Sequence, residues 1–93
     1  MLEKIKKSLR ITTDELNEEI EDLIEAAKID LNISGVDKIE ETDKLIIRAV
    51  TLYCKAQFGY DNPEADRFEQ TYESLKTHLS MSSDYKAGDE DET

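Results

Sequence analysis

The sequence has 93 residues, of which 23 are acidic and 12 are basic, so its formal net charge is −11. A chain this short forms one domain at most, and its negative charge argues against generic binding to DNA or RNA. Cys54 is the only cysteine, which excludes an intrachain disulfide and a thiolate metal cluster. No apolar run is long enough for a signal peptide or a membrane span, so we expect a soluble protein made in the cytoplasm.

The first two predicted helices follow from the spacing of apolar residues. Residues 2–9 should form a short helix, followed by Ile11 as a hydrophobic anchor. Thr12 and Glu15 have the spacing of a capping box, which predicts that the second helix runs from about residue 13 to residue 32. Its apolar stripe consists of Leu16, Ile20, Leu23, Ile24, Ala27 and Leu31. Gly35 is suited to the left-handed position that follows a helix.

The third predicted helix begins near Thr42, where Asp43 favours the positive end of the helix dipole, and runs to about Phe58. Apolar residues cover most of its circumference. They are Leu45, Ile46, Ala49, Val50, Leu52, Tyr53 and Ala56, extended by Ile47, Cys54 and Phe58. A helix of this kind is packed on several sides, so we expect it to be the central helix.

The remaining segments complete an all-α fold. Residues 59–63 should form a turn, with Asn62 as N-cap and Pro63 as the first residue of a fourth helix. The apolar stripe of that helix is Ala65, Phe68, Tyr72, Leu75 and Leu79. The periodicity then stops. We therefore predict a bundle of about four helices over residues 1–79 and a disordered, flexible acidic tail over residues 80–93.

The sequence contains no set of residues that is typical of an enzyme active site. His78 is the only histidine and lies near the end of the fourth helix, where a solvated side chain is the plain interpretation. Cys54 lies on a strongly apolar helix and is expected to be a small core residue. There is no glycine-rich phosphate loop and no calcium-loop pattern. We predict no catalytic residue, cofactor or metal site.

Charge is distributed in stripes. Residues 11–43 carry a net charge of −10, whereas residues 1–10 and 44–60 each carry +3. Glu18, Asp22 and Glu25 fall on one face of the second helix, and Lys44, Arg48 and Lys55 form a polar strip on the third. If copies of the chain assemble into a ring, each subunit needs two complementary patches. These six residues are the candidate subunit interface. The alternatives are that the two surfaces neutralise each other inside one subunit, or that the acidic face only confers solubility.

Two isoleucines lie off the apolar stripe of the second helix. Ile29 and Ile33, together with Val36, could form an apolar patch that contacts another protein. The other interpretation is that they pack against the connector formed by residues 36–41.

Several segments resemble phage head-tail connector proteins, which are often described as DNA-packaging proteins of phages and prophages. They are Leu9-Arg10-Ile11, the acidic run from Glu18 to Ala27, the apolar run from Leu45 to Tyr53, and the closing segment from Tyr72 to Tyr85. The resemblance covers about residues 2–85. The short connector between the second and third helices and the acidic tail depart from the family pattern.

The resemblance implies a structural role. Such proteins form a ring under the portal of the DNA-filled capsid and provide the seat for head-completion or tail proteins. The partners would be portal, head-completion and tail proteins. The free chain would be a monomer if its copies need the portal as a template for association. The protein would pass from the host cytoplasm to the head-tail junction of the virion. The alternative function is that of a small acidic inhibitor that mimics DNA and blocks a basic nucleic-acid-binding protein.

Overall fold

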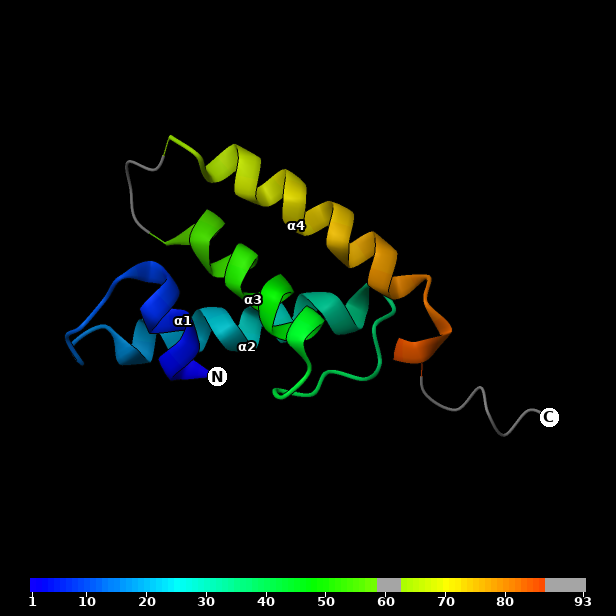
Figure 1. The fold of residues 1–93 in the computed structure, drawn as a ribbon, viewed down its shortest axis with the longest axis horizontal. Coiled ribbons are helices and arrows are strands. Elements are labelled where there is room, and N and C mark those ends of the chain that lie inside the picture. Colours follow the sequence, from blue (N-terminus) through cyan, green and yellow to red (C-terminus); the bar gives the residue numbers. More distant parts are fainter. Residues whose placement is uncertain (59–62, 87–93) are drawn as a thin grey trace.

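The computed structural model describes residues 1–58 and 63–86 (Figure 1). Four α-helices follow one another: α1 (Leu2–Leu9), α2 (Asn17–Ile33), α3 (Lys44–Gln57) and α4 (Ala65–Ser80). A 3₁₀ helix, η1 (Ser83–Tyr85), follows them. The described ranges contain no β-strand, which confirms the prediction of an all-α bundle of about four helices.

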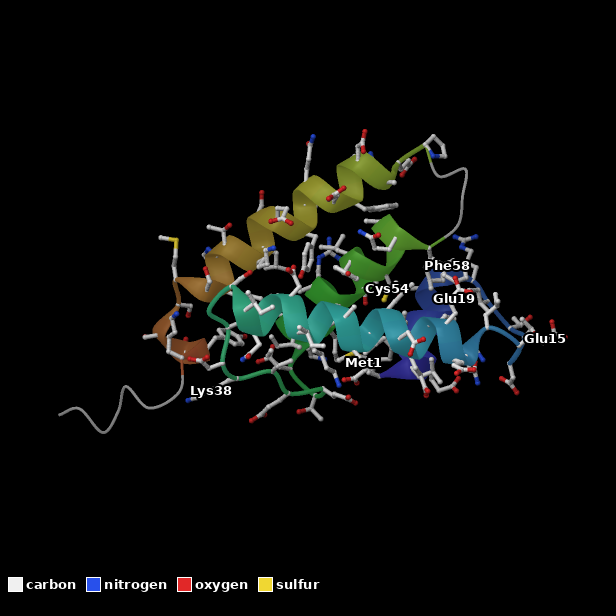
Figure 2. All side chains as sticks on the ribbon, turned by 180° about the vertical axis from the view of Figure 1, so that it is seen from behind. Met1, Glu15, Glu19, Lys38, Cys54 and Phe58 are labelled. Atoms are coloured by element: carbon white, nitrogen blue, oxygen red, sulfur yellow. The ribbon has the colours of Figure 1, made fainter. Side chains whose placement is uncertain are left out.

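The α3 helix is the centre of the bundle, as its apolar circumference predicted. It packs against α1, α2 and α4. Figures 1 and 2, which view the molecule from opposite sides, place α1 and α3 on the same side of α2. The buried residues of α3 are Ile46, Ala49, Val50, Leu52 and Cys54. Leu45, in its first turn, is exposed, so the buried sector begins one residue later than expected.

The α1 helix and the apolar stripe of α2 confirm the periodicity of the sequence. Ile5 of α1 is fully buried, and Ile11 packs against the core after the helix has ended. The fully or largely buried residues of α2 are Ile20, Ile24, Ala27 and Leu31, with Leu16 and Leu23 packed at the edge.

The predicted capping box at the start of α2 is wrong. Residues 12–16 form a loop, and α2 begins at Asn17 with Leu16 as an N-cap that provides no side-chain hydrogen bond. Thr13 accepts a hydrogen bond from the backbone N–H of Glu15 instead. The nearby carboxylate of Asp14 binds the ammonium of Lys6 at 2.8 Å. Because Lys6 is 4% exposed, this ion pair ties the loop to α1, and the helix starts only after it.

Both α1 and α2 end in the same hydrogen-bonding pattern. At the end of α2, the N–H of Val36 binds the carbonyl of Leu31, and the N–H of Gly35 binds that of Asn32. This is a Schellman motif, and Gly35 occupies its left-handed position with φ of 110°, as predicted. At the end of α1 the equivalent position, with φ of 61°, is occupied by Arg10.

The termini of α3 and α4 differ in part from the prediction. Asp43 is the N-cap of α3, and its carboxylate accepts the N–H groups of Leu45 and Ile46. The α4 helix begins at Ala65, and Pro63 lies in the preceding turn rather than in the helix. The predicted N-cap Asn62 and the rest of that turn lie outside the described residues.

Part of the segment that was predicted as the tail contacts the helical domain, whereas the domain boundary at residue 79 stays a prediction. Ser80 still belongs to α4, and Tyr85 of η1 docks onto the segment between α2 and α3. Its carbonyl accepts the N–H groups of Asp37 and Lys38, and its hydroxyl bonds the carboxylate of Asp43. The periodicity of α4 could not show this, because Tyr85 is held by hydrogen bonds and not by a helical stripe. The last seven residues of the predicted tail lie outside the described residues.

Candidate interaction surface

The acidic residues of α2 lie opposite the core. Glu18, Asp22 and Glu25 are exposed and share one face of the helix, because they are four and three residues apart. Ile20, Ile24, Ala27 and Leu31 occupy the opposite, buried face. Figure 2 views the bundle from the side of α2 and shows Glu15 beyond the start of this helix. We call Glu18, Asp22, Glu25, Ile29 and Ile33 the outer face of α2.

Two isoleucines continue this outer face toward the C-terminal end of the helix. Ile29 is 58% exposed and Ile33 is 78% exposed. Val36 is buried in the core instead of joining them in a patch. A contact of the two isoleucines with another protein stays a prediction. A face that combines three carboxylates with two exposed isoleucines is less suited to permanent solvation than a wholly charged one.

The acids of α2 differ in how they are paired. Glu25 forms a long ion pair of 3.5 Å with Lys28, whose ammonium also binds Glu41 of the connector. The ammonium of the chain's N-terminus lies 3.6 Å from Glu41 as well. These contacts raise the pKa of Lys28 and lower that of Glu41, the hydrogen bond between the two being the largest cause in each. Within the described residues, no ion pair is formed by Glu18, Glu21 or Asp22.

A hollow of about 470 Å³ opens beside the outer face, between α1 and α2. Its lining combines carboxylates with apolar groups. The residues are Met1, Leu2, Glu21, Asp22, Ile24, Glu25 and Glu41. Asp22 and Glu25 were predicted from the sequence as interface residues, but Glu21 and Glu41 were not. Glu41 comes close to α2 only because the connector between α2 and α3 returns toward α1.

The basic strip of α3 is partly used inside the subunit. Lys55 lies over the ring of Phe68, 5.4 Å from its centroid, and is half-buried. Lys44 and Arg48 are exposed, and neither forms an ion pair with another described residue. The strip available to a partner is therefore Lys44 and Arg48, with Lys55 engaged against α4.

The acidic and basic surfaces do not neutralise each other in the part of the chain that the structure describes. No ion pair joins Glu18, Asp22 or Glu25 to the cations of α3. Repulsion among the acids is therefore not relieved by the strip on α3.

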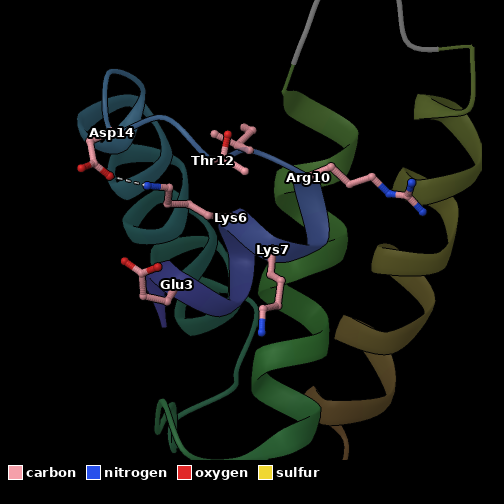
Figure 3. A pocket seen from close by; sticks show the side chains of 7 residues that line it. Glu3, Lys6, Lys7, Arg10, Thr12 and Asp14 are labelled. Carbon is pink, nitrogen blue, oxygen red and sulfur yellow. Dashed lines mark hydrogen bonds and ion pairs between the residues drawn. The ribbon is translucent and has the colours of Figure 1, made fainter.

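The cations of α1 form a second basic surface that the sequence analysis did not select. A pocket of about 460 Å³ at the end of α1 is lined by Lys6, Lys7, Arg10 and Asp14, among others. Figure 3 shows Lys6 pointing at Asp14, whereas Lys7 and Arg10 point to the side on which α3 and α4 lie. Lys7 and Arg10 are exposed and form no ion pair with a described residue. The net charge of residues 1–10 was a usable signal for this surface.

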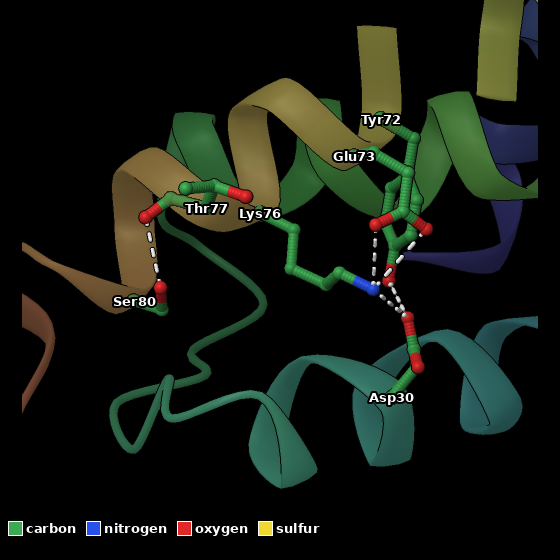
Figure 4. A network of polar contacts seen from close by, with 6 residues as sticks. All are labelled: Asp30, Tyr72, Glu73, Lys76, Thr77 and Ser80. Carbon is green, nitrogen blue, oxygen red and sulfur yellow. Dashed lines mark hydrogen bonds and ion pairs between the residues drawn. The ribbon is translucent and has the colours of Figure 1, made fainter. Parts of the chain in front are cut away.

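A polar network joins α2 to α4 (Figure 4). The hydroxyl of Tyr72 donates a hydrogen bond of 2.6 Å to Asp30, and the ammonium of Lys76 lies 2.9 Å from the same carboxylate oxygen. Lys76 also pairs with Glu73 at 3.0 Å. Burial opposes ionisation of Asp30, but its hydrogen bonds from Tyr72 and Lys76 hold its pKa below the ordinary value. The network fixes α4 on α2 and exposes no reactive group.

Groups capable of covalent chemistry are poorly placed for it. Cys54 is fully buried, and burial raises the pKa of its thiol to about 12, so it is not a thiolate at neutral pH. His78 is exposed on α4. Among the described residues, no group of three or more His, Cys, Asp and Glu side chains could hold a metal ion. No described helix is long and apolar enough to cross a membrane.

A comparison with protein families decides the identity of this small helical bundle. Residues 1–86 match the model of the phage connector proteins, which spans all four helices and η1. The chain belongs to this family. The connector protein is thus a structural component of a phage virion that contacts other head or tail proteins, as its resemblance to head-tail connectors predicted. The match ends at Lys86, the last residue that the structure describes. No curated protein and no solved structure shows significant similarity to it.

Proposed function

We propose that this connector protein forms a ring of identical copies under the portal of a tailed phage or prophage, where it joins the DNA-filled head to the tail. The observation that carries the proposal is the exposure of two surfaces of opposite charge that form no ion pairs with each other within residues 1–58 and 63–86. Glu18 and Asp22 lie on one, and Lys44 and Arg48 on the other. Different, complementary patches on one subunit generate a ring when the rotation between copies closes.

The mechanism is docking by surface complementarity. The ring would extend the portal channel and provide a seat for head-completion or tail proteins. Acidic residues that face the channel would offer few contacts to phosphate, so DNA could pass without sticking. Among the described residues, no side chain is placed to act as a catalyst. A purely structural role therefore leaves none of them unexplained.

An acidic DNA mimic is the competing function. Its carboxylates would imitate phosphates, and the outer face of α2 supplies them. The exposed cations Lys7, Arg10, Lys44 and Arg48 count against it, because a mimic gains nothing from a basic surface on the same small domain. The family membership also favours the connector role.

The test is association with the portal protein of the same phage or prophage. Purified portal and connector protein should co-elute in size-exclusion chromatography as a complex heavier than either component. The complex should weaken as NaCl rises from 0.05 to about 0.5 M, because exposed charge pairs are screened at that ionic strength. Co-elution with a basic DNA-binding protein, and none with the portal, would support the mimic instead.

A further inference from the structure

We propose that Arg10 is the cationic anchor of the contact between neighbouring copies, seated in the acidic hollow beside the outer face of α2 in the next copy. The inference rests on the proposed function and names the two surfaces that meet. It adds a residue of α1, and it selects Glu21 and Asp22 as the carboxylates that receive it.

The conformation of Arg10 is the first observation. With φ of 61° it is the one described residue other than glycine that has a positive φ. An L-residue in the left-handed region loses energy relative to glycine through the contact of its Cβ with the backbone. The chain places Gly35 at the equivalent position of α2, so the same motif occurs once with the favoured residue and once with arginine. Arginine at this position therefore points to a role for its side chain.

The surroundings of Arg10 give its side chain no role inside the subunit. The residue is exposed, and no ion pair or hydrogen bond joins its guanidinium to another described residue. Figure 3 shows the side chain directed away from Lys6 and Asp14, toward the side of α3 and α4. Lys7 lies one turn back on α1, and its side chain also points away from Asp14. These two cations can therefore reach a partner.

The occupant that fits is a second copy of this chain. Its hollow between α1 and α2 presents Glu21 and Asp22, which are exposed and form no ion pair with another described residue, beside Met1, Leu2 and Ile24. A guanidinium binds carboxylates in a bidentate fashion, and its stem packs on apolar groups. The exposed Ile29 and Ile33 on the same helix extend the surface to be covered.

Within the described residues of one molecule, no ion pair joins Arg10 to Glu21 or Asp22. The hollow includes Leu2 at the start of α1, whereas Arg10 follows the end of that helix, about 12 Å further along its axis at a rise of about 1.5 Å per residue. One copy can therefore use both surfaces at once, each with a different neighbour. Such a head-to-tail contact is the kind that closes into a ring.

Charge exchange tests the contact. Arg10→Glu and Asp22→Arg should each abolish the complex with the portal protein, whereas the variant that carries both should restore it, because every interface then regains opposite charges. Lys38→Glu, an exposed charge reversal on the connector between α2 and α3, should leave the complex intact. If Arg10→Glu assembles as the parent does, the inference is wrong and the proposed function stands.

The variant Arg10→Gly separates the backbone from the side chain. It should raise the melting temperature of the free protein by a few degrees, since glycine suits the left-handed position, and should still weaken assembly at least tenfold. A more stable variant that assembles normally would show that Arg10 has no docking role.

Cross-linking decides the contact whatever the portal does. In a Cys54→Ala background, a concentrated equimolar mixture of Arg10→Cys and Asp22→Cys should be joined to a heterodimer by a short bis-maleimide, whereas each single variant alone should stay largely monomeric. Absence of the heterodimer would overturn the inference. The heterodimer without binding to the portal would support the contact and contradict the proposed function.

Discussion

The hydroxyl of Tyr72 on α4 lies 2.6 Å from the carboxylate of Asp30 on α2, a contact between residues 42 positions apart in the sequence. Tyr72 is buried, and its ring meets that of Tyr53 edge-on at a centroid distance of 5.3 Å. The ammonium of Lys76 pairs with the carboxylate of Asp30 and compensates its charge. These contacts fix α4 to the helix that carries the acidic outer face.

Removal of the Tyr72 hydroxyl should destabilise the domain. Tyr72→Phe keeps the ring and deletes the hydrogen bond to a charged acceptor, at a cost of about 1–2 kcal/mol in the free energy of unfolding. Tyr53→Phe is the matched control and should change this free energy little, because its hydroxyl forms no hydrogen bond with another described residue, although its ring also contacts Tyr72. Urea unfolding followed by circular dichroism measures both. Equal stability of Tyr72→Phe and the parent would show that this hydrogen bond does not stabilise the fold.

The same network should respond to acid. Hydrogen bonds hold the pKa of Asp30 below its ordinary value, so its carboxylate stabilises the folded state above about pH 4 and loses this contribution as the pH falls through the folded-state pKa. Asn cannot titrate at this position. The stability difference between the parent and Asp30→Asn should therefore be largest near pH 6 and shrink toward pH 2. A difference that stays constant over this range would contradict the ion-pair role.

Much of the fold could be predicted from the sequence because it depends on local spacing. The apolar positions of α2 and the wide apolar sector of α3 each identify a buried face without knowledge of the partner helix. Gly35 marks a helix end for the same local reason. The failures involve contacts distant in sequence. Asp14 is used by Lys6, and Tyr85 is held by residues 37, 38 and 43, and neither contact leaves a periodic pattern.

The candidate site was predictable in part on the same grounds. The exposure of Glu18, Asp22 and Glu25 follows from their position opposite an apolar stripe. The engagement of Lys55 by Phe68 requires the packing of α3 on α4, which spacing alone does not give. The role proposed for Arg10 rests on the positive φ of this residue, which cannot be read from the sequence.

The segment after α4 should contribute to stability. A chain that ends after Leu79 loses η1 and the hydrogen bonds of Tyr85, and we expect its free energy of unfolding to fall by about 1–3 kcal/mol. Tyr85→Phe, which keeps the backbone contacts and loses only the hydroxyl, should show a smaller loss. Thermal unfolding by circular dichroism compares the two. A truncated chain as stable as the parent would support the predicted domain boundary at residue 79.

Repulsion in the acidic outer face is offset in part by the helix dipole. Glu18 and Asp22 are like charges four residues apart, but Glu18 lies in the first turn of α2, where the dipole favours an acid. The double variant Glu18→Gln/Asp22→Asn should therefore keep the stability of the parent to within about 0.5 kcal/mol at low salt. The same variant should bind the portal less tightly. Glu69→Gln, on the exposed face of α4, serves as the control and should leave binding unchanged. Undiminished binding by the double variant would exclude the outer face from the interface.

Charge reversal at Arg48 tests the basic strip of α3. Arg48→Glu should weaken the complex with the portal while the helical circular dichroism stays that of the parent, because the residue is exposed and pairs with no described carboxylate. Lys38→Glu applies the same charge change away from the strip. Unaltered assembly of Arg48→Glu would leave Arg10 and Lys7 as the basic side of the contact.

Electron microscopy of the portal protein, alone and with an excess of this chain, tests the central claim most directly. The account predicts additional ring-shaped density, coaxial with the portal channel, in particles that contain both proteins. Portal particles whose projections stay the same in the presence of the excess chain would contradict it.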